Sequence, residues 1–248
     1  LDDSAGGRFT IDSVTGIVTV ANGALLNREA AASHSILVRA TSADLSFSTI
    51  AVDISLIDVD EFDISPAADI NATANLVAEL SVQGTATGIT VGASDADATT
   101  NAITYSLDDN AGGRFQINAT TGVVTVGATA LNYEFASSYS ITVRATSADS
   151  STTTLTLTIN LTDVNEFATT AITDTDATVD AILENAVTGS LVGITAFASD
   201  GDGTDVISYS LTNNAGGRFT IDSVTGVVTV ADGTLLNRDI LDYVRKNL

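Results

Sequence analysis

The sequence predicts an all-β protein made of tandem two-sheet sandwiches, and three observations support this fold class. The apolar residues, 44% of the chain, are mostly Val, Ile, Leu and Ala, with no Trp, Met or Cys, and Thr and Ser fill much of the remainder. This mixture favours half-buried strands over helices. Apolar and polar residues alternate with period two over several stretches. Near-identical segments also recur at the spacing of one β-sandwich domain, about 105 residues.

The strands are clearest in residues 63–167, where the alternation gives each strand one buried and one solvated face. The step Thr-Thr-Gly that ends at Gly122 is typical of a turn, because glycine is free to take a positive φ. About seven strands over this length predict one sandwich, and no helical periodicity of useful length is present. The clearest predicted strands cover residues 85–93, 102–107, 115–117, 122–126, 139–144 and 155–161.

Three near copies of one segment set the domain organisation. They are LDDSAGGRFTIDSVTGIVTV, LDDNAGGRFQINATTGVVTV and LTNNAGGRFTIDSVTGVVTV, which start at residues 1, 107 and 211. A unit of about 105 residues is longer than a solenoid repeat and fits a whole sandwich. We therefore predict three modules: residues 1–62 are the C-terminal part of one, residues 63–167 form a complete one, and residues 168–248 begin a third with an atypical tail, 240–248. The first, partial module is expected to leave an exposed sheet edge.

The strong negative charge excludes one class of function. With 31 acidic and 9 basic residues the formal net charge is -22, so no basic surface is available to bind nucleic acid through its phosphates. Without cysteine the chain has no disulfides and no thiolate metal sites. No run of 18 apolar residues exists, so no membrane span is predicted in this chain. The acidic groups must be dispersed over solvated faces or neutralised by cations.

No catalytic constellation is predicted. His34 is the single histidine, and it aligns with Tyr139 of the sibling strand, which favours a packing role. One histidine in a partial module cannot serve a Ser/His/Asp triad in three modules. Paired carboxylates could serve glycoside hydrolysis, but their duplication in every repeat argues against a unique active site. We therefore expect a protein that is not an enzyme.

Acidic residues recur at fixed offsets. Glu79 precedes Asp95 by 16 residues, and Glu184 precedes Asp200 by the same 16. The similar stretches Asp-Val-Asp-Glu-Phe, residues 58–62, and Asp-Val-Asn-Glu-Phe, residues 163–167, close the first and second modules. Calcium takes about six to eight oxygen ligands from carboxylates, amides and carbonyls. We interpret the two stretches as joints that calcium cross-links, with loops of the next module closing each site.

Several motifs then point to a known family. TGVVTV, LNYE, YSITVRAT and LTINLTDVNEF follow one another in the complete module. This arrangement resembles the cadherin repeat, most closely the cadherin-like repeats of large bacterial surface proteins. The resemblance covers nearly the whole chain except the tail. It implies seven-stranded Greek-key β-sandwiches of the cadherin and immunoglobulin-like type.

The resemblance also implies a set of calcium ligands at each joint. Glu79 matches the first Glu motif of the family, and Glu134 matches its Asp-Arg-Glu motif. At the joint between the second and third modules the implied ligands are Glu79, Glu134, Asp163, Asn165, Glu166, Asp200 and Asp202. At the joint between the first and second modules they are Glu29, Asp58, Asp60, Glu61, Asp95 and Asp97.

The chain departs from the family at several ligand positions. Asn132 stands where the family usually has Asp, and its amide oxygen can ligate without contributing charge. Each linker ends in Glu-Phe and thereby loses one ligand. Ser147 stands where an Asp is usual, and Asp149, two residues on, is the candidate substitute. These departures predict fewer or weaker calcium ions per joint than in the animal proteins.

From the resemblance we expect a calcium-dependent adhesion or stalk module of a long, secreted surface protein of bacterial type. Calcium would make the joints rigid, and without it the carboxylates would repel and the modules would pivot. The expected partners are neighbouring repeats of the same chain, with another copy of the chain, in homophilic adhesion, or a surface glycan as further candidates.

Two other interpretations stay open. The chain could be a calcium-independent, immunoglobulin-like spacer of a secreted protein, acidic only for solubility. It could also be a calcium-dependent carbohydrate-binding module, although the absence of Trp leaves few aromatic rings to stack on sugars. A lone Asp-x-Asp is usually a turn with solvated side chains. Its register with three other acidic motifs favours calcium here.

Overall fold

The computed structural model describes residues 1–237, so the predicted atypical tail lies outside the described residues. The chain divides into two compact units. Unit 1 comprises Leu1–Val77, Ser81–Leu131 and Ser138–Asn160, and unit 2 comprises Ala78–Leu80, Asn132–Ser137 and the chain from Leu161 onward. Strands dominate both units, and the only helices among the described residues are two single 3-10 turns, Gly23–Leu25 and Gly233–Leu235. Within residues 1–237, no helix has the length and apolar character that crossing a membrane requires.

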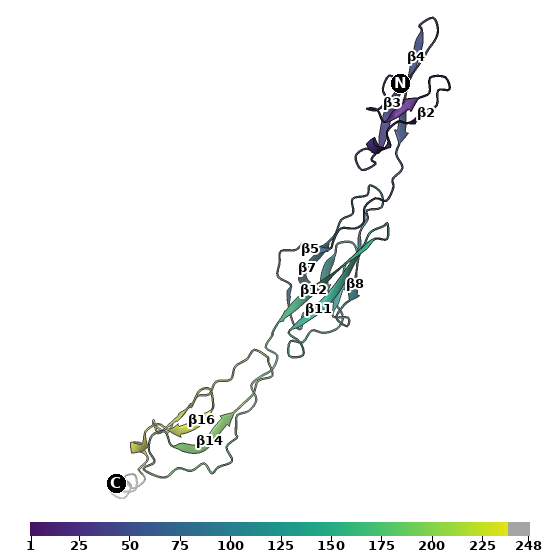
Figure 1. The fold of residues 1–248 in the computed structure, drawn as a ribbon. Coiled ribbons are helices and arrows are strands. Elements are labelled where there is room, and N and C mark those ends of the chain that lie inside the picture. The colour runs from purple at the N-terminus through teal and green to yellow at the C-terminus, as the bar shows by residue number, and fades with distance from the viewer. Residues whose placement is uncertain (238–248) are drawn as a thin grey trace. The chain divides into compact units, whose positions relative to one another are not determined.

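Residues 63–167, here called the central segment, form two antiparallel four-stranded sheets (Figure 1). Consecutive strands β7 and β8 lie in different sheets, as do β10 and β11, which is the crossover pattern of a Greek-key sandwich. The first sheet, in the order β5-β7-β10-β9, consists of β5 (Ala68–Asp69), β7 (Ala86–Gly92), β10 (Val123–Val126) and β9 (Phe115–Ile117). The second, in the order β6-β12-β11-β8, consists of β6 (Leu76–Ala78), β12 (Thr152–Thr162), β11 (Ser138–Thr146) and β8 (Thr104–Asp109).

The core of the central segment lies between these sheets. Ile89 and Val124 of the first sheet and Ile141 and Val143 of the second are almost completely buried. The ring of Phe115 meets the ring of Tyr139 edge-on, with centroids 6.2 Å apart. Alternate residues of β12, from Thr152 to Thr162, are exposed threonines and an asparagine. The predicted all-β sandwich is confirmed, with period two giving one buried and one wet face.

The strand predictions differ from the structure at several strand ends, including that of β12, which begins at Thr152 and not at residue 155, and in two further ways. The short strands β5 and β6 were not predicted, because two or three residues are too few to show an alternation. The strand expected over residues 102–107 is β8, which begins two residues later, at Thr104. Its pairing with β11 shifts register between Thr142 and Val143, and such an irregularity is not visible in a hydrophobic pattern.

In residues 1–62, β1 (Phe9–Ile11) pairs with β2 (Val18–Val20), and β3 (Ser33–Thr41) pairs with β4 (Phe47–Ser55). Phe9 and Ile36 are buried, whereas Ile50 of β4 is 62% exposed. Among the described residues β4 has β3 as its one partner, so an open sheet edge is present, as predicted.

Residues 168–237 form a four-stranded sheet in the order β13-β14-β16-β15, around buried Val192, Val228 and Val230. Its strands are β13 (Thr173–Asp174), β14 (Leu191–Phe197), β16 (Val227–Val230) and β15 (Phe219–Ile221). Residues 208–213, which correspond to β8, contain no strand. The partner of β8 in the central segment, β11, has no counterpart among the described residues here. The division into one complete and two partial repeats stays a prediction.

Gly122 is required at the turn before β10. Its φ is +68°, as the turn chemistry predicts, and a Cβ there would lie 2.1 Å from the carbonyl oxygen of Val91. Gly122→Ala therefore combines backbone strain with a backbone clash, and it is expected to destabilise the central segment by more than about 2 kcal/mol. Calorimetric unfolding of the full chain measures this loss.

Gly84→Ala is the matched control for this prediction. Gly84 also has a positive φ, +92°, but nothing lies within 4 Å of its added Cβ. Only the backbone strain remains there, so the loss should be smaller, about 1 kcal/mol. Equal losses in the two variants would contradict the assignment of a close approach at Gly122.

Candidate metal sites at the two linkers

Four groups of carboxylates surround the two linkers, which are residues 58–62 (first linker) and 163–167 (second linker). Within each group, one oxygen from every residue lies within 4.8 Å of the others. We name each group after one member. At the second linker these are the Glu79 cluster, with Glu79, Glu134, Asp163 and Glu166, and the Asp200 cluster, with Asp200, Asp202 and Asp205. At the first linker they are the Glu29 cluster, with Glu29, Asp58 and Glu61, and the Asp60 cluster, with Asp60, Asp97 and Asp149.

Glu79 follows β6 directly and is 1% exposed. Its Oε2 accepts a hydrogen bond of 2.6 Å from the backbone N–H of Tyr133, and its Oε1 accepts one of 2.9 Å from Val164. A buried carboxylate is costly unless it is paired or hydrogen-bonded. These two amides satisfy one lone pair on each oxygen and fix the side chain against the second linker.

The second Asp of each Asp-x-Asp motif holds the linker in the same way. Asp202, 5% exposed, accepts from the backbone N–H of Glu166 at 3.0 Å and from that of Phe167 at 3.1 Å. Asp97, 0% exposed, accepts from Glu61 and Phe62, both at 3.2 Å. Each linker backbone is therefore bonded to a buried carboxylate of the Asp-x-Asp loop that follows it in the chain.

The first Asp of each linker has two oxygens in different surroundings. Asp163 Oδ2 accepts from the N–H of Thr204 at 2.9 Å and from its hydroxyl at 2.5 Å. Asp58 Oδ2 accepts from Thr99 at the same two distances. The Oδ1 atoms of Asp163 and Asp58 are buried and have no hydrogen-bond partner. The Oε1 atom of Glu29 is also buried and has no hydrogen-bond partner. A buried acceptor left without a donor is costly and indicates a missing partner.

Crowding of carboxylates raises several pKa values. Burial, followed by the charges of Glu79 and Glu134, raises the pKa of Glu166 to about 7. Burial, and then Glu29, raises the pKa of Glu61. The pKa of Asp163 is lowered, chiefly by the hydroxyl of Thr204. Each linker therefore combines one carboxylate whose pKa is lowered with another whose pKa is raised.

The pKa of Asp60 is also raised, by burial and then by the charge of Asp149. The pKa of Asp58 is lowered, first by the hydroxyl of Thr99. The first linker thus also pairs a lowered with a raised pKa, and there the charge of Arg28 adds to the lowering at Asp58.

The donor set fits a hard divalent cation. Every cluster member is a carboxylate that can only accept hydrogen bonds when ionised. The two ion pairs found among the described residues, Arg39 with Asp2 and Arg144 with Asp108, lie outside the four clusters. Oxygen-only donors with several carboxylates suit calcium better than a transition metal.

All the carboxylates predicted as ligands lie in these clusters except Asp95. The two predicted amide ligands, Asn132 and Asn165, are not carboxylates and stay predictions. Asp95 accepts from the hydroxyl of Ser147 at 2.5 Å and from the N–H of Asp97. Asn132 Oδ1 accepts from the N–H of Phe135 at 2.6 Å, which is a local turn contact. The side-chain nitrogen of Asn165 donates to Asp205 at 3.1 Å. Asp149 lies with Asp60 and Asp97, the position in which it was the candidate substitute for a missing Asp.

Sequence reasoning missed Asp205, Thr99 and Thr204. Asp205 follows Asp200 by five residues in a loop rich in Asp and Gly, and this proximity was the available signal. Thr99 and Thr204 each stand four residues after the first Asp of their Asp-x-Asp motif. That recurrence was visible, but a hydroxyl gives no sign in sequence that it bonds to a linker.

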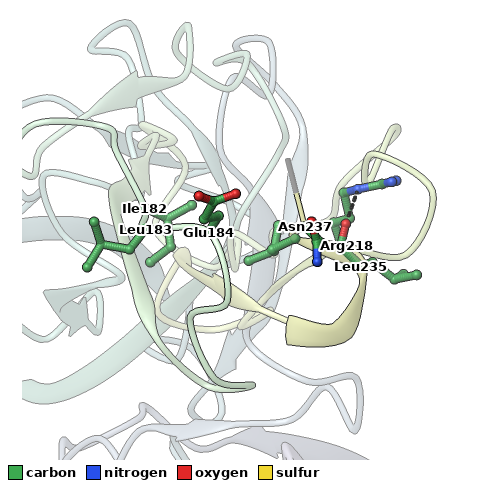
Figure 2. A pocket seen from close by; sticks show the side chains of 7 residues that line it. Ile182, Leu183, Glu184, Arg218, Leu235 and Asn237 are labelled. Atoms are coloured by element: carbon green, nitrogen blue, oxygen red, sulfur yellow. Dashed lines mark hydrogen bonds between the residues drawn. The ribbon is translucent and has the colours of Figure 1, made fainter. Parts of the chain in front are cut away.

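A pocket in unit 2 repeats part of this chemistry. Glu184 and Asn237 each follow their counterparts, Glu79 and Asn132, by 105 residues. Arg218 Nε donates to the carbonyl of Leu235 at 3.0 Å across its rim (Figure 2). The counterpart of Glu134, residue 239, lies outside the described residues. The pocket is lined by Ile182, Leu183, Glu184, Arg218, Leu235, Leu236 and Asn237.

Comparisons with known proteins place part of this chain in a known family. Residues 76–162 match the family model of the cadherin domain. The chain is 29% identical to mouse Protocadherin Fat 4 over 90% of its length, and 31% identical to human Cadherin-23 over 96%. It spans 4% and 7% of those two relatives, which are far longer.

Solved structures of a cadherin and a protocadherin share the fold of this chain. A crystal structure of mouse cadherin-23 EC22-24 matches with a TM-score of 0.66 and 25% identity, over 94% of this chain and 74% of that one. The protocadherin gammaB7 EC3-6 cis-dimer structure matches with a TM-score of 0.68 and 21% identity, over 93% of this chain and 56% of that one. Together with the family match, these likenesses identify residues 76–162 of this chain as a cadherin repeat.

Proposed function

We propose that this chain acts as a run of cadherin repeats in a cell-surface adhesion or stalk protein, and that calcium held around its two linkers stiffens it. The observation that carries the calcium proposal is the buried, unpartnered Oδ1 of Asp163 within a cluster of four carboxylates. The likeness to protocadherin Fat 4 and cadherin-23 supports the adhesion proposal. An extracellular location follows from the same likeness and from calcium chemistry, because extracellular calcium modules bind at about 10⁻⁴–10⁻³ M.

The residues that would hold calcium are the members of the four clusters. At the second linker, the Glu79 and Asp200 clusters would bind, and at the first linker, the Glu29 and Asp60 clusters. A bound calcium ion supplies the positive charge that these carboxylates lack, and it gives the orphaned oxygens a partner. This chain's own residues do the rest. Glu79 and Asp202 fix the second linker through its backbone amides, and Asp97 does the same at the first.

The proposed partners are neighbouring repeats in the same chain and, for adhesion, a second copy of the chain. One of the similar solved structures is described as a cis-dimer, which supports self-association as the form of adhesion to test. No catalytic role is proposed, because the acidic groups are duplicated at two linkers and are bonded to backbone amides in the same way at both.

Calcium is expected to raise the unfolding temperature of the full chain. A ligand that binds only the folded state at about 100 times its Kd adds roughly 2.7 kcal/mol per site. Differential scanning calorimetry in calcium and in EGTA measures this, and small-angle scattering reports stiffening. Identical melting and scattering in the two buffers would overturn the calcium proposal and leave the calcium-independent spacer.

Asp163→Asn tests the carrying observation. The amide keeps the shape of the side chain but removes the charge and one ligand oxygen from the Glu79 cluster, so the calcium affinity of that linker should fall about tenfold or more. Isothermal titration calorimetry measures the affinity. Asp108→Asn is the matched control, because Asp108 pairs with Arg144 outside all four clusters and its loss should leave calcium binding unchanged.

Glu166 makes the second linker sensitive to pH. Its folded pKa, about 7, lies above its ordinary value of 4.5, so the folded state holds this proton more tightly than the unfolded state does. Without calcium, stability should therefore fall as pH rises from about 4.5 to about 7 and then level off. Calcium must displace the proton, so calcium affinity should weaken as pH falls below about 7.

Glu166→Gln should remove this part of both pH dependences. Titration of calcium at several pH values, with thermal melts in EGTA over the same range, measures the effect. A variant with the same pH profile as the unmodified chain would show that another group is responsible.

A further inference from the structure

Thr99 and Thr204 make the same contact at the two linkers. Each threonine donates both its backbone N–H and its hydroxyl to the Oδ2 of the linker's first Asp, Asp58 or Asp163. Thr204 follows Thr99 by 105 residues, and Asp163 follows Asp58 by the same 105 residues, which is the repeat offset. The recurrence in two independently placed loops shows that the contact belongs to the repeat and not to one local packing accident.

In this contact the two oxygens of the aspartate have different surroundings. Oδ2 receives two donors from one threonine, while Oδ1 of the same carboxylate is buried without a partner. For Asp163, Oδ2 is therefore occupied by Thr204, and Oδ1 is the oxygen left to face a cation with the other members of the Glu79 cluster. With two donors from one residue on one oxygen, the carboxylate cannot turn about its last torsion without breaking a charge-assisted bond.

We propose that Thr99 and Thr204 are positioning residues: each forms a clasp that ties the linker's first Asp to the following Asp-x-Asp loop and presents its Oδ1 to calcium. This inference rests on the proposed calcium function for its second half. The first half, the clasp itself, stands on the four hydrogen bonds that the two threonines donate. Preorganised ligands bind more tightly, because less ordering is left to do when the ion arrives.

At the second linker a further hydrogen bond joins the Glu79 cluster to the Asp-x-Asp loop. Glu134 Oε1 accepts from the N–H of Gly203 at 3.2 Å, next to Thr204. The first linker has no such contact among the hydrogen bonds of the described residues that involve Glu29, whose Oε1 is unpartnered. The threonine clasp is therefore the shared element of the two linkers.

The test replaces each hydroxyl and then restores it. Thr99→Val and Thr204→Val keep the shape and the backbone N–H but remove the hydroxyl donor, and Thr99→Ser and Thr204→Ser restore it. Thr100→Val is the matched control, since Thr100 is the next residue in the same loop and its hydroxyl has no partner. Calcium affinity of the full chain is measured by isothermal titration calorimetry. Amide hydrogen exchange at positions 99 and 204 is followed in EGTA by NMR.

Removing the hydroxyl should weaken calcium binding about tenfold at the altered linker alone, the size expected for one hydrogen bond to a charged group. The serine variants should bind within about twofold of the unmodified chain, and Thr100→Val should be unchanged. In EGTA the amides of Thr99 and Thr204 should exchange slowly in the unmodified chain and faster in the matching valine variants.

Three results would overturn the inference: unchanged affinity in both valine variants, serine variants as weak as the valine ones, or fast exchange of both threonine amides in the unmodified chain without calcium. A chain that binds no calcium at all would overturn the proposed function instead. In that case the exchange experiment alone decides whether the clasp exists.

Discussion

The structure around the linkers depends on carboxylates that lie close together. At the second linker, oxygens of Glu79, Glu134, Asp163 and Glu166 lie within 4.8 Å of one another, and no ion pair among the described residues reaches them. Like charges at such distances repel. Desolvation, and then this repulsion, raises the pKa of Glu166, and Asp163 keeps a buried oxygen without a hydrogen-bond partner.

The repeats tolerate this crowding because backbone amides and a threonine hydroxyl donate hydrogen bonds that stabilise the negative charge of the carboxylates. Glu79 and Asp202 each accept two amide hydrogen bonds, and Asp163 accepts two donors from Thr204. These bonds tie the second linker to the loops around it. The joint therefore has protein contacts of its own, in addition to any that calcium would supply.

Much of the fold could be predicted from the sequence, because its long strands carry strong periodic patterns. β11 and β12 alternate over nine and eleven residues, and Gly122 marks its turn by being glycine. β5 and β6 could not be predicted, since two or three residues carry no period. The start of β8 was placed two residues early because the apolar alternation continues through Ala102 and Ile103, before the pairing with β11 begins at Thr104.

The candidate site was predictable to the level of residue type and offset, and not to the level of contacts. The acidic positions recur in register, so the sequence could indicate which carboxylates gather. It could not indicate that Asp95 is held by Ser147, or that Asn132 serves its own turn, because both contacts depend on side-chain direction. Asp205 and the two threonines were missed for the same reason.

The most direct test of the central claim is a crystal structure of this chain grown with calcium, with anomalous scattering used to locate the ions. The account predicts anomalous peaks at both linkers, with Asp163 Oδ1 and Asp58 Oδ1 among the ligand atoms at about 2.3–2.6 Å. Density that shows water or an amide bonded to those two oxygens, and no anomalous peak within reach of any of the four clusters, would contradict it.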